Sequence, residues 1–220
     1  STPLAQITSC KFFYKSSSFL NFFLRTSNVD LLLINKNFFI CQEKAPSRVG
    51  AVQILHSNII TLEENHFENF SFYTNPTTLA EGVGFISIYR TQAYTVENYP
   101  ILAIVSNNKF YKMESSVLRG VLGILNIKEI LIFNNTFNSC TSLRGGGLSV
   151  ESSVKVEVNL NFFEKCFSLE DSGAVFFQNI KTLSFSNLIL ADCHSETEGG
   201  AIKVQNVDEV FADSLLGRNT

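Results

Sequence analysis

The fold is decided by a phrase that the chain repeats about every 26 residues. Residues 135–140 read Asn-Thr-Phe-Asn-Ser-Cys, residues 161–166 read Asn-Phe-Phe-Glu-Lys-Cys, and residues 188–193 repeat the phrase loosely as Leu-Ile-Leu-Ala-Asp-Cys. Ten residues after the Phe or Leu comes a glycine-led apolar run, such as Gly-Leu-Ser-Val at 147–150 and Gly-Ala-Ile-Lys-Val at 200–204. A repeat this short cannot bury its own core and is stable only when copies stack. The sequence therefore predicts a solenoid.

The Phe or Leu inside the phrase marks the repeat along the whole chain. The markers are Phe12, Phe38, Phe67, Phe110, Phe137, Phe163, Leu190 and Leu215, at spacings of 26, 29, 43, 27, 26, 27 and 25 residues. Before each marker lies a second apolar segment with alternating polar residues, as in Val-Lys-Val-Glu-Val at 154–158. Alternation with a period of two is typical of half-buried strands. With the glycine-led run, this predicts about eight coils of three short strands each.

Short strands joined by turns, without helical periodicity, predict an all-β parallel β-helix. Parallel pairing needs no helical crossover in a solenoid, because the rest of each coil is the crossover. The inward phenylalanines are expected to stack ring over ring. The corner asparagines are expected to bond up and down the stack, satisfying backbone groups that the turns expose; they are Asn65, Asn108, Asn135 and Asn161. A helical solenoid is disfavoured, because no repeat contains the long helix-forming stretch that it needs.

The repeat resembles the right-handed parallel β-helix of the pectin-lyase-like superfamily. Its Gly-Gly-Ala-Ile and Phe-x-x-Cys elements are most similar to repeats of chlamydial polymorphic outer-membrane proteins and related protist surface proteins. The glycine motif is complete at residues 199–202, and Cys stands where the chlamydial Phe-x-x-Asn tetrapeptide has Asn, at Cys41, Cys140, Cys166 and Cys193. The resemblance covers essentially the whole chain. It implies a right-handed solenoid with a surface-exposed, adhesive or scaffolding role.

Composition narrows the class of protein. The 220 residues are 45% hydrophobic, enough for one large core, and we expect residues 1–220 to form a single solenoid. A net charge of -3 argues against nucleic-acid binding, and no apolar run approaches the ~20 residues of a membrane helix. No signal peptide opens the sequence, so we expect a piece of, or a stacked unit in, a longer structure. Candidate N-glycosylation sites at Asn69 and Asn134 favour a secretory route.

Four of the five cysteines are predicted to share one inward position. Cys140, Cys166 and Cys193 follow the markers of three consecutive coils, and Cys41 is placed three coils earlier, with Phe70 and Met113 between. Successive rungs bring Cα atoms within disulfide range, so one bond among the three is geometrically allowed. We favour free thiols acting as small hydrophobes. Metal binding is disfavoured, because no Cys-x-x-Cys or clustered histidines occur.

The regular spacing breaks once, between Phe67 and Phe110. The excess predicts two loop insertions in one coil, near residues 71–83 and 89–100, and insertions in solenoids often lie on the binding face. The candidate interaction surface consists of the loop tyrosines and one arginine, Tyr73, Tyr89, Arg90, Tyr94 and Tyr99. The alternative is that these rings fold back and cover their own coil.

No catalytic set emerges, and no cofactor is expected. The Asp-Asp and Gly-His-Gly motifs of hydrolases resembling polygalacturonase do not occur, and carboxylate pairs at glycosidase spacing cannot be assembled from the strand positions. Asp171 and Glu198 stand at matching corners of adjacent coils. They either share a Ca²⁺ or are solvent-facing loop charges, and we favour the second interpretation.

The sequence favours a non-enzymatic structural or adhesive scaffold, extracellular or at the cell surface, within a filament or coat. Expected partners are other chains or further coils stacking at the rod ends, and surface glycans. Nucleic acid is not expected, nor is a membrane span in this segment. The alternative is a carbohydrate-active or carbohydrate-binding β-helix resembling polysaccharide lyases and hydrolases, with Tyr89, Arg90 and Tyr94 as substrate contacts.

Overall fold

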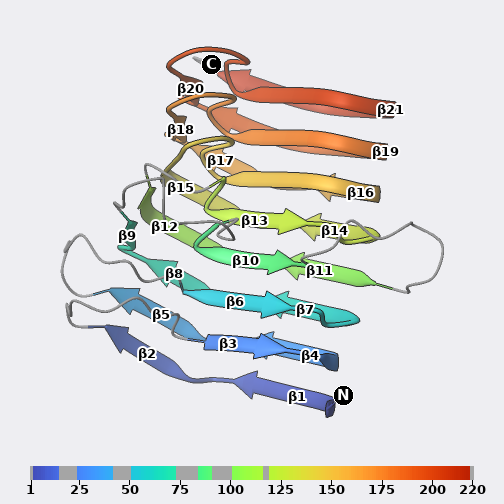
Figure 1. Cartoon of the computed structure of the whole chain (residues 1–220). Coiled ribbons are helices and arrows are strands. Elements are labelled where there is room, and N and C mark those ends of the chain that lie inside the picture. Colours follow the sequence, from blue (N-terminus) through green and yellow to red (C-terminus); the bar gives the residue numbers. More distant parts are fainter. Residues whose placement is uncertain are drawn as a thin grey trace.

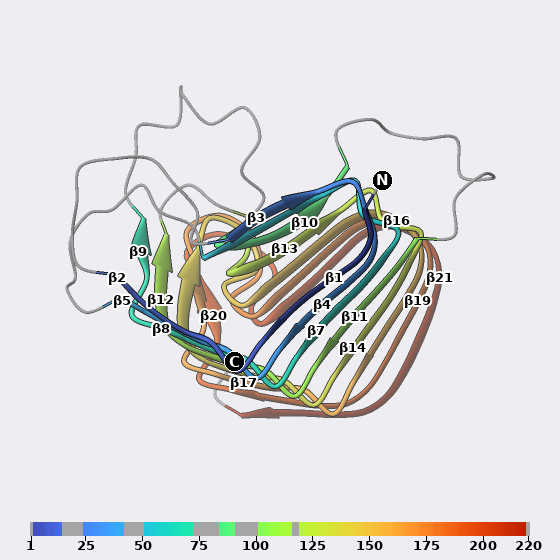
Figure 2. The same cartoon turned by 90° about the horizontal axis from the view of Figure 1, so that it is seen from below.

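The computed structural model is an all-β solenoid whose strands pair in parallel with those of the turns before and after (Figure 1). It describes residues 2–14, 24–41, 51–72, 84–90, 101–115 and 119–218. Seen along the stack, successive turns superpose around a common core (Figure 2). Within the described residues, no helix has the length and apolarity needed to cross a bilayer. The predicted fold class, an all-β parallel solenoid, is confirmed.

Three faces form the wall, and each is a parallel sheet that gains one level per turn. Face A comprises β3 (Leu24–Ser27), β6 (Val52–Leu55), β10 (Ile86–Tyr89), β13 (Leu122–Leu125) and the first parts of β16 (Leu148–Asn159), β19 (Val175–Ala191) and β21 (Ile202–Arg218). Face B comprises β1 (Thr2–Thr8), β4 (Val29–Asn35), β7 (Ile59–Glu63), β11 (Leu102–Ser106), β14 (Glu129–Phe133), the last part of β16 and the middles of β19 and β21. Face C comprises β2 (Lys11–Tyr14), β5 (Phe38–Cys41), β8 (His66–Glu68), β9 (Ser71–Phe72), β12 (Lys109–Ser115), β15 (Thr136–Ser142), β17 (Phe162–Glu164), β18 (Phe167–Ser168), β20 (His194–Ser195) and the last parts of β19 and β21.

The solenoid has about six turns, where the marker spacing predicts about eight coils. The difference lies at the two ends. The first level consists of β1 on face B and β2 on face C, and β21 supplies the last level of each face. Counting markers therefore counts each partial end turn as a whole coil.

A column of stacked phenylalanine rings fills the core behind face C. Ring centroids lie 4.7 Å apart for Phe12 and Phe39, 4.8 Å for Phe39 and Phe67, 5.3 Å for Phe67 and Phe110, 4.4 Å for Phe110 and Phe137, and 4.6 Å for Phe137 and Phe163. Leu190 pairs with Phe163 and continues the column. The predicted inward stack is therefore confirmed in its central turns.

Two of the predicted markers are wrong by one or two residues. Phe39, not Phe38, occupies the ring column, and Phe38 points outward with 44% of its surface exposed. Gly217, not Leu215, pairs with Leu190. A shift of one residue moves a strand side chain to the opposite face of the sheet. Adjacent apolar residues at both places made the two registers indistinguishable by hydrophobicity.

A ladder of asparagines joins the turns at the corner between faces B and C. Each amide Nδ2 donates to the Oδ1 of the next asparagine at 3.0 Å, from Asn37 through Asn65, Asn108 and Asn135 to Asn161. Each also donates to a backbone carbonyl of the turn below. This confirms the predicted role of the corner asparagines. Asn37 was missed because the marker Phe38 set its phase wrongly. Below Asn37, the backbone amide of Cys10 donates to its Oδ1.

The residue before each ladder position has left-handed backbone, whatever its side chain. Examples are Lys36, Glu64, Asn107 and Leu160, with φ between 52° and 56°. Left-handed φ is uncommon outside glycine, asparagine and aspartate. The fold therefore imposes this conformation on residues that do not prefer it, and it leaves little signal in the sequence.

Candidate functional site

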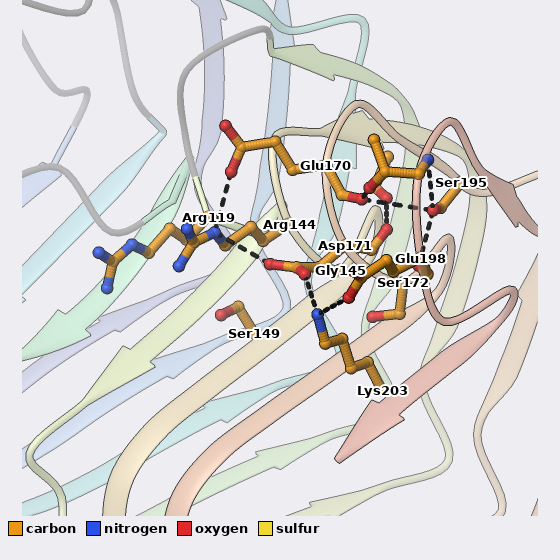
Figure 3. Close-up of polar contacts among 12 residues, drawn as sticks. Arg119, Arg144, Gly145, Ser149, Glu170, Asp171, Ser172, Ser195, Glu198 and Lys203 are labelled. Atoms are coloured by element: carbon orange, nitrogen blue, oxygen red, sulfur yellow. Dashed lines mark hydrogen bonds and ion pairs between the residues drawn. The ribbon is translucent and has the colours of Figure 1, made fainter. Parts of the chain in front are cut away.

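Charged side chains gather at the bends between faces C and A in the upper half of the solenoid (Figure 3). We call them the corner cluster: Arg119, Arg144, Glu170, Asp171, Glu198 and Lys203. Arg119 precedes β13, Arg144 precedes β16, and the two form a parallel bridge between consecutive turns. The acids lie in the bends before β19 and β21, so stacking brings together residues that are far apart in the chain.

Asp171 is the centre of this cluster. Its carboxylate forms an ion pair with Arg144 Nε of the turn below at 3.1 Å and accepts a hydrogen bond from Lys203 Nζ of the turn above. Arg144 Nε also lies 3.1 Å from Glu170 Oε2, and Lys203 Nζ lies 2.8 Å from Glu198 Oε2. Hydrogen bonding to Asp171, and then to Glu198, raises the pKa of Lys203 above its usual range. These residues form an ionic clip across three turns.

The clip bears on the Ca²⁺ hypothesis for Asp171 and Glu198. The two carboxylates do approach one another, but both bind the Lys203 ammonium, which lies between them (Figure 3). Among the described residues, no three His, Cys, Asp or Glu side chains form a metal-binding group. Sequence reasoning missed Lys203 and Arg144. The alternation of side chains within Gly-Ala-Ile-Lys-Val indicates that Lys203 faces outward. Its ion-pair partners can be identified only once the stacking of the turns is known.

A further carboxylate, that of Glu151, lies beside the cluster on the outer side of face A. The Glu151 side chain is 6% exposed and is paired with Arg119 Nη1. Ser149 Oγ donates to its other oxygen at 3.4 Å. A buried carboxylate is costly unless it is paired and hydrogen-bonded, and both conditions are met here. The Glu151 carboxylate therefore links its own turn to the turn of Arg119.

Two residues of the predicted interaction surface are buried, although Tyr89 lies in register with Leu125 and Glu151 on the outer side of face A. Tyr89 and Arg90 are 3% and 5% exposed. The Tyr89 hydroxyl accepts from Gln53 Nε2 at 2.9 Å, and its ring packs in a cluster with Leu55 and Leu125. Arg90 Nη2 donates to Asn58 Oδ1 at 2.9 Å and to a backbone carbonyl. Tyr89 therefore covers its own coil, as the alternative interpretation expected.

The rest of that predicted surface stays a prediction. Tyr73, Tyr94 and Tyr99 lie outside the described residues, as does most of both predicted insertions, at 73–83 and 91–100. The carbohydrate-active alternative relied on Tyr89, Arg90 and Tyr94. With the first two buried and hydrogen-bonded within the chain, it has no described substrate contact.

The two sequons differ in their surroundings. Asn134 is exposed at a corner, where its Nδ2 donates to Asn107 Oδ1 at 2.6 Å. Asn69 is half-buried beside Glu68, and Ser71 of its sequon is 4% exposed. Glycosylation at either position stays a prediction, and the surroundings favour Asn134.

A shallow hollow of about 300 Å³ lies at the corner between faces A and B. Its lining combines Asn179 and Asn206, which hydrogen-bond to one another at 3.1 Å, with Lys181 and Asp208. Charges of both signs and amides line an open surface. The hollow provides polar contacts without a distinct chemical preference.

The cysteines are free thiols. Cys140, Cys166 and Cys193 are fully buried in three successive turns, as predicted. Cys41 is also buried but pairs with Tyr14 and follows its ring residue by two positions instead of three. Its assignment to the same position was therefore wrong, for the same reason as the marker Phe38.

No protein-family model, curated protein or solved structure matches the chain. The architecture therefore rests on the internal evidence of register, stacked rings and asparagine ladder. Membership of the pectin-lyase-like superfamily and similarity to the chlamydial proteins stay proposals. What is established is a parallel β-solenoid.

Proposed function

We propose that this chain is a non-enzymatic structural scaffold and interaction element, extracellular or at the cell surface, in a filament or coat. The observation that carries the proposal is that the repeated polar side chains bind other turns of the same solenoid. The corner asparagines bond to one another, and Asp171 bonds to cations of the turns below and above. These groups serve cohesion between turns, which is the requirement of a stiff rod.

The top of the rod supports the proposal that strands from elsewhere stack there. β21 pairs with β19 along one edge, and no described strand lies along its other edge (Figure 1). Its core-facing residues Val204, Val210 and Leu215 are 38%, 46% and 51% exposed. An unpaired edge with exposed apolar side chains is a template for further strand pairing. Further coils of the same polypeptide or another chain would complete it.

The location is tested by labelling cells of the source organism with an antibody against the chain. We expect intact cells, or material outside them, to be labelled. A signal that appears only after the cells are permeabilised would contradict a surface role.

The absence of enzymatic activity is tested separately on a panel of plant, algal and bacterial polysaccharides. New reducing ends would report hydrolysis, and absorbance of unsaturated products would report lyase activity. We expect neither. Turnover that survives further purification would overturn the scaffold proposal and restore the carbohydrate-active alternative.

A further inference from the structure

One corner position holds an exposed leucine where every other described turn has a polar residue. The position is the left-handed one between faces B and C, and Leu160 occupies it with φ 55° and 57% of its surface exposed. Leucine does not favour left-handed backbone, and an exposed apolar side chain gains nothing from burial. A residue that breaks two local rules at one place is typical of a site with a further role. The residues at this position are, in chain order, Ser9, Lys36, Glu64, Asn107, Asn134, Leu160, Asn187 and Ser214.

Two aromatic side chains extend this apolar surface around Asn134. Phe133 precedes Asn134 in the chain and is 38% exposed, and Leu160 lies one turn above Asn134. Phe162 is half-buried on the outer side of face C and pairs with Thr136. We call Phe133, Leu160 and Phe162 the corner patch. Stacked turns are about 4.8 Å apart, so the whole patch lies within reach of a group attached to Asn134.

Asn134 opens a sequon whose hydroxyl residue is Thr136. Its side chain is exposed, and its Nδ2 donates to Asn107 Oδ1 of the turn below. Nδ2 carries two hydrogens, so an attached sugar replaces one and leaves the other for this bond. The other sequon has different surroundings, because Asn69 is half-buried and the polar Lys112 lies one turn above it. Only the Asn134 sequon adjoins the corner patch.

The first sugar of an N-linked glycan, N-acetylglucosamine, has the chemistry to cover this patch. Its acetyl methyl group and the C–H groups on one face of its ring are apolar, whereas its hydroxyls lie around the edge. Packing the apolar face on the patch removes side-chain surface from water, while the hydroxyls stay hydrated. A sugar attached to Asn134 is also held beside the patch at a high effective concentration. A weak contact is therefore sufficient.

We propose that Asn134 carries an N-linked glycan whose first N-acetylglucosamine lies on the corner patch. The proposal rests on the extracellular location proposed above, because such glycans are attached in the secretory pathway. The donor is an oligosaccharide on a polyprenyl diphosphate, and an oligosaccharyltransferase joins its anomeric carbon to Nδ2. The bond between that carbon and the diphosphate breaks, the lipid diphosphate leaves with the electron pair, and Nδ2 loses one proton. Nothing is oxidised or reduced.

Occupancy is measured on the chain secreted from a eukaryotic host that makes high-mannose glycans, by mass spectrometry of proteolytic peptides. All chains carry Asn69→Asp, which removes the second sequon and keeps a residue type that tolerates its φ of 63°. We expect Asn134 to be modified, and Thr136→Val, which removes the hydroxyl with little change in shape, to abolish the modification. Secreted protein with an unmodified Asn134 would overturn the proposal.

Packing on the patch is measured as a thermal shift. Endoglycosidase H trims the glycan to one N-acetylglucosamine, and the Thr136→Val protein is the reference without sugar. We expect the sugar to raise the unfolding midpoint by about 2–4 °C. Leu160→Asn, which restores the residue type of the turns below and above and creates no sequon, should reduce this gain to less than about 1 °C. No gain in the Leu160 protein, or equal gains in both proteins, would show that the patch does not hold the sugar.

A chemical route tests the packing if the chain is not secreted. Bacterially produced protein carries Cys10→Ser and Asn134→Cys, so that its other thiols are buried, and the new thiol is alkylated with N-acetylglucosaminyl iodoacetamide. This adduct should raise the midpoint relative to the iodoacetamide adduct, and Leu160→Asn should remove the difference. Equal midpoints for the two adducts would contradict the patch whatever the location of the natural protein. Labelling of permeabilised cells alone would instead contradict the proposed location.

Discussion

The side chain of Asn135 makes five hydrogen-bonding contacts across three turns. Its Oδ1 accepts from the backbone and side-chain amides of Asn108, and its Nδ2 donates to Val105, Phe133 and Asn161. Three of these contacts are to backbone groups near the corner, the Asn108 amide and the Val105 and Phe133 carbonyls, and buried backbone groups need such partners. A buried polar residue that satisfies its neighbours in this way costs more to remove than a single hydrogen bond is worth.

We therefore expect Asn135→Ala to lower the free energy of unfolding by about 2–4 kcal/mol, measured by urea denaturation. The matched control is its neighbour Asn134, which is exposed and outside the buried ladder. Asn134→Ala should cost only about 1 kcal/mol, because asparagine tolerates its φ of 54° better than alanine does. Equal losses in the two variants would show that the ladder contributes nothing specific.

The neighbouring phenylalanines Phe38 and Phe39 test the register of the second turn. Phe39 is fully buried between the rings of Phe12 and Phe67, whereas Phe38 faces solvent. Phe39→Ala should cost about 3–5 kcal/mol in thermal or urea unfolding, and Phe38→Ala less than about 1 kcal/mol. The reverse order would restore the marker predicted from the sequence.

That marker shows where sequence reasoning stops at the residue scale. The period of the repeat and the inward position of Phe137 follow from the sequence, because polar neighbours flank this ring. The inward position of Phe163, which has the apolar neighbour Phe162, follows from its spacing of 26 residues from Phe137. At Phe38-Phe39 and at Leu215-Leu216-Gly217 both phases are apolar, so hydrophobicity cannot select one. The hydrogen bonds of Asn37 select it, and they exist only between turns.

Between elements, the tightest contacts are backbone to backbone at the bends that lead into face A. A Cβ added to Gly146 would lie 2.2 Å from the Gly173 carbonyl oxygen and 2.6 Å from that of Phe167. These atoms belong to the next turn and to its strand β18, so neither can move without opening the stack. Glycine is needed at this position because a side chain would not fit, and not because of the backbone conformation, since its φ is not left-handed.

Gly146→Ala should therefore destabilise the protein by about 3 kcal/mol or more in urea unfolding. Gly200→Ala is the matched control, because that Cβ would meet nothing within 4 Å, although φ is +44°. Its cost should be about 1–2 kcal/mol, from backbone strain alone. A smaller loss for Gly146→Ala than for Gly200→Ala would contradict the close stacking of these bends.

The ionic clip predicts a pH dependence. The raised pKa of Lys203 means that its contribution is fully present below the unfolded value, near 10.5, and is lost as pH rises through the folded value. Lys203→Met should cost about 1–2 kcal/mol at pH 7–9, and its difference from the parent protein should shrink above pH 10.5. The readout is urea unfolding as a function of pH. A difference that is zero at pH 8, or that grows above pH 11, would contradict the clip.

This cluster also marks the limit of prediction between elements. The matching corners of Asp171 and Glu198 follow from the period, and the approach of these acids was anticipated. The identity of the cation between them was not. Lys203 lies 32 residues after Asp171 and faces it only because β21 continues outward-facing positions above β19. To predict which side chain of the next turn is the partner, the strand register must be known to within one residue.

At the scale of the whole molecule, the repeat determines the class of fold, whereas the proposed function rests on the ends and the surface of the solenoid. The parallel solenoid follows from a phrase that cannot bury itself alone. The number of turns does not follow, because a marker shows neither whether its turn is closed nor which strands complete it. The burial of Tyr89 and Arg90 did not follow from the sequence for a related reason, since an insertion is recognisable by its length but not by the direction in which it folds.

The exposed top of the rod gives a prediction for the isolated 220-residue chain. Val210 faces the core side of β21, whereas Phe211 beside it faces outward. We expect the chain to self-associate with increasing concentration in sedimentation velocity, and Val210→Lys to prevent this. Phe211→Lys introduces the same charge on the outer side and should leave association unchanged. Equal effects of the two lysines would point to a side-to-side contact instead.

The central claim is that successive turns lie in register, so that equivalent side chains form columns inside the solenoid. A crystal structure of the chain measures this most directly at Phe137, Phe163 and Leu190. The account predicts inward rings for Phe137 and Phe163, nearly parallel, with centroids 4.6 Å apart and Leu190 directly above. Rings that point to solvent, or that are not neighbours along the axis, would contradict it.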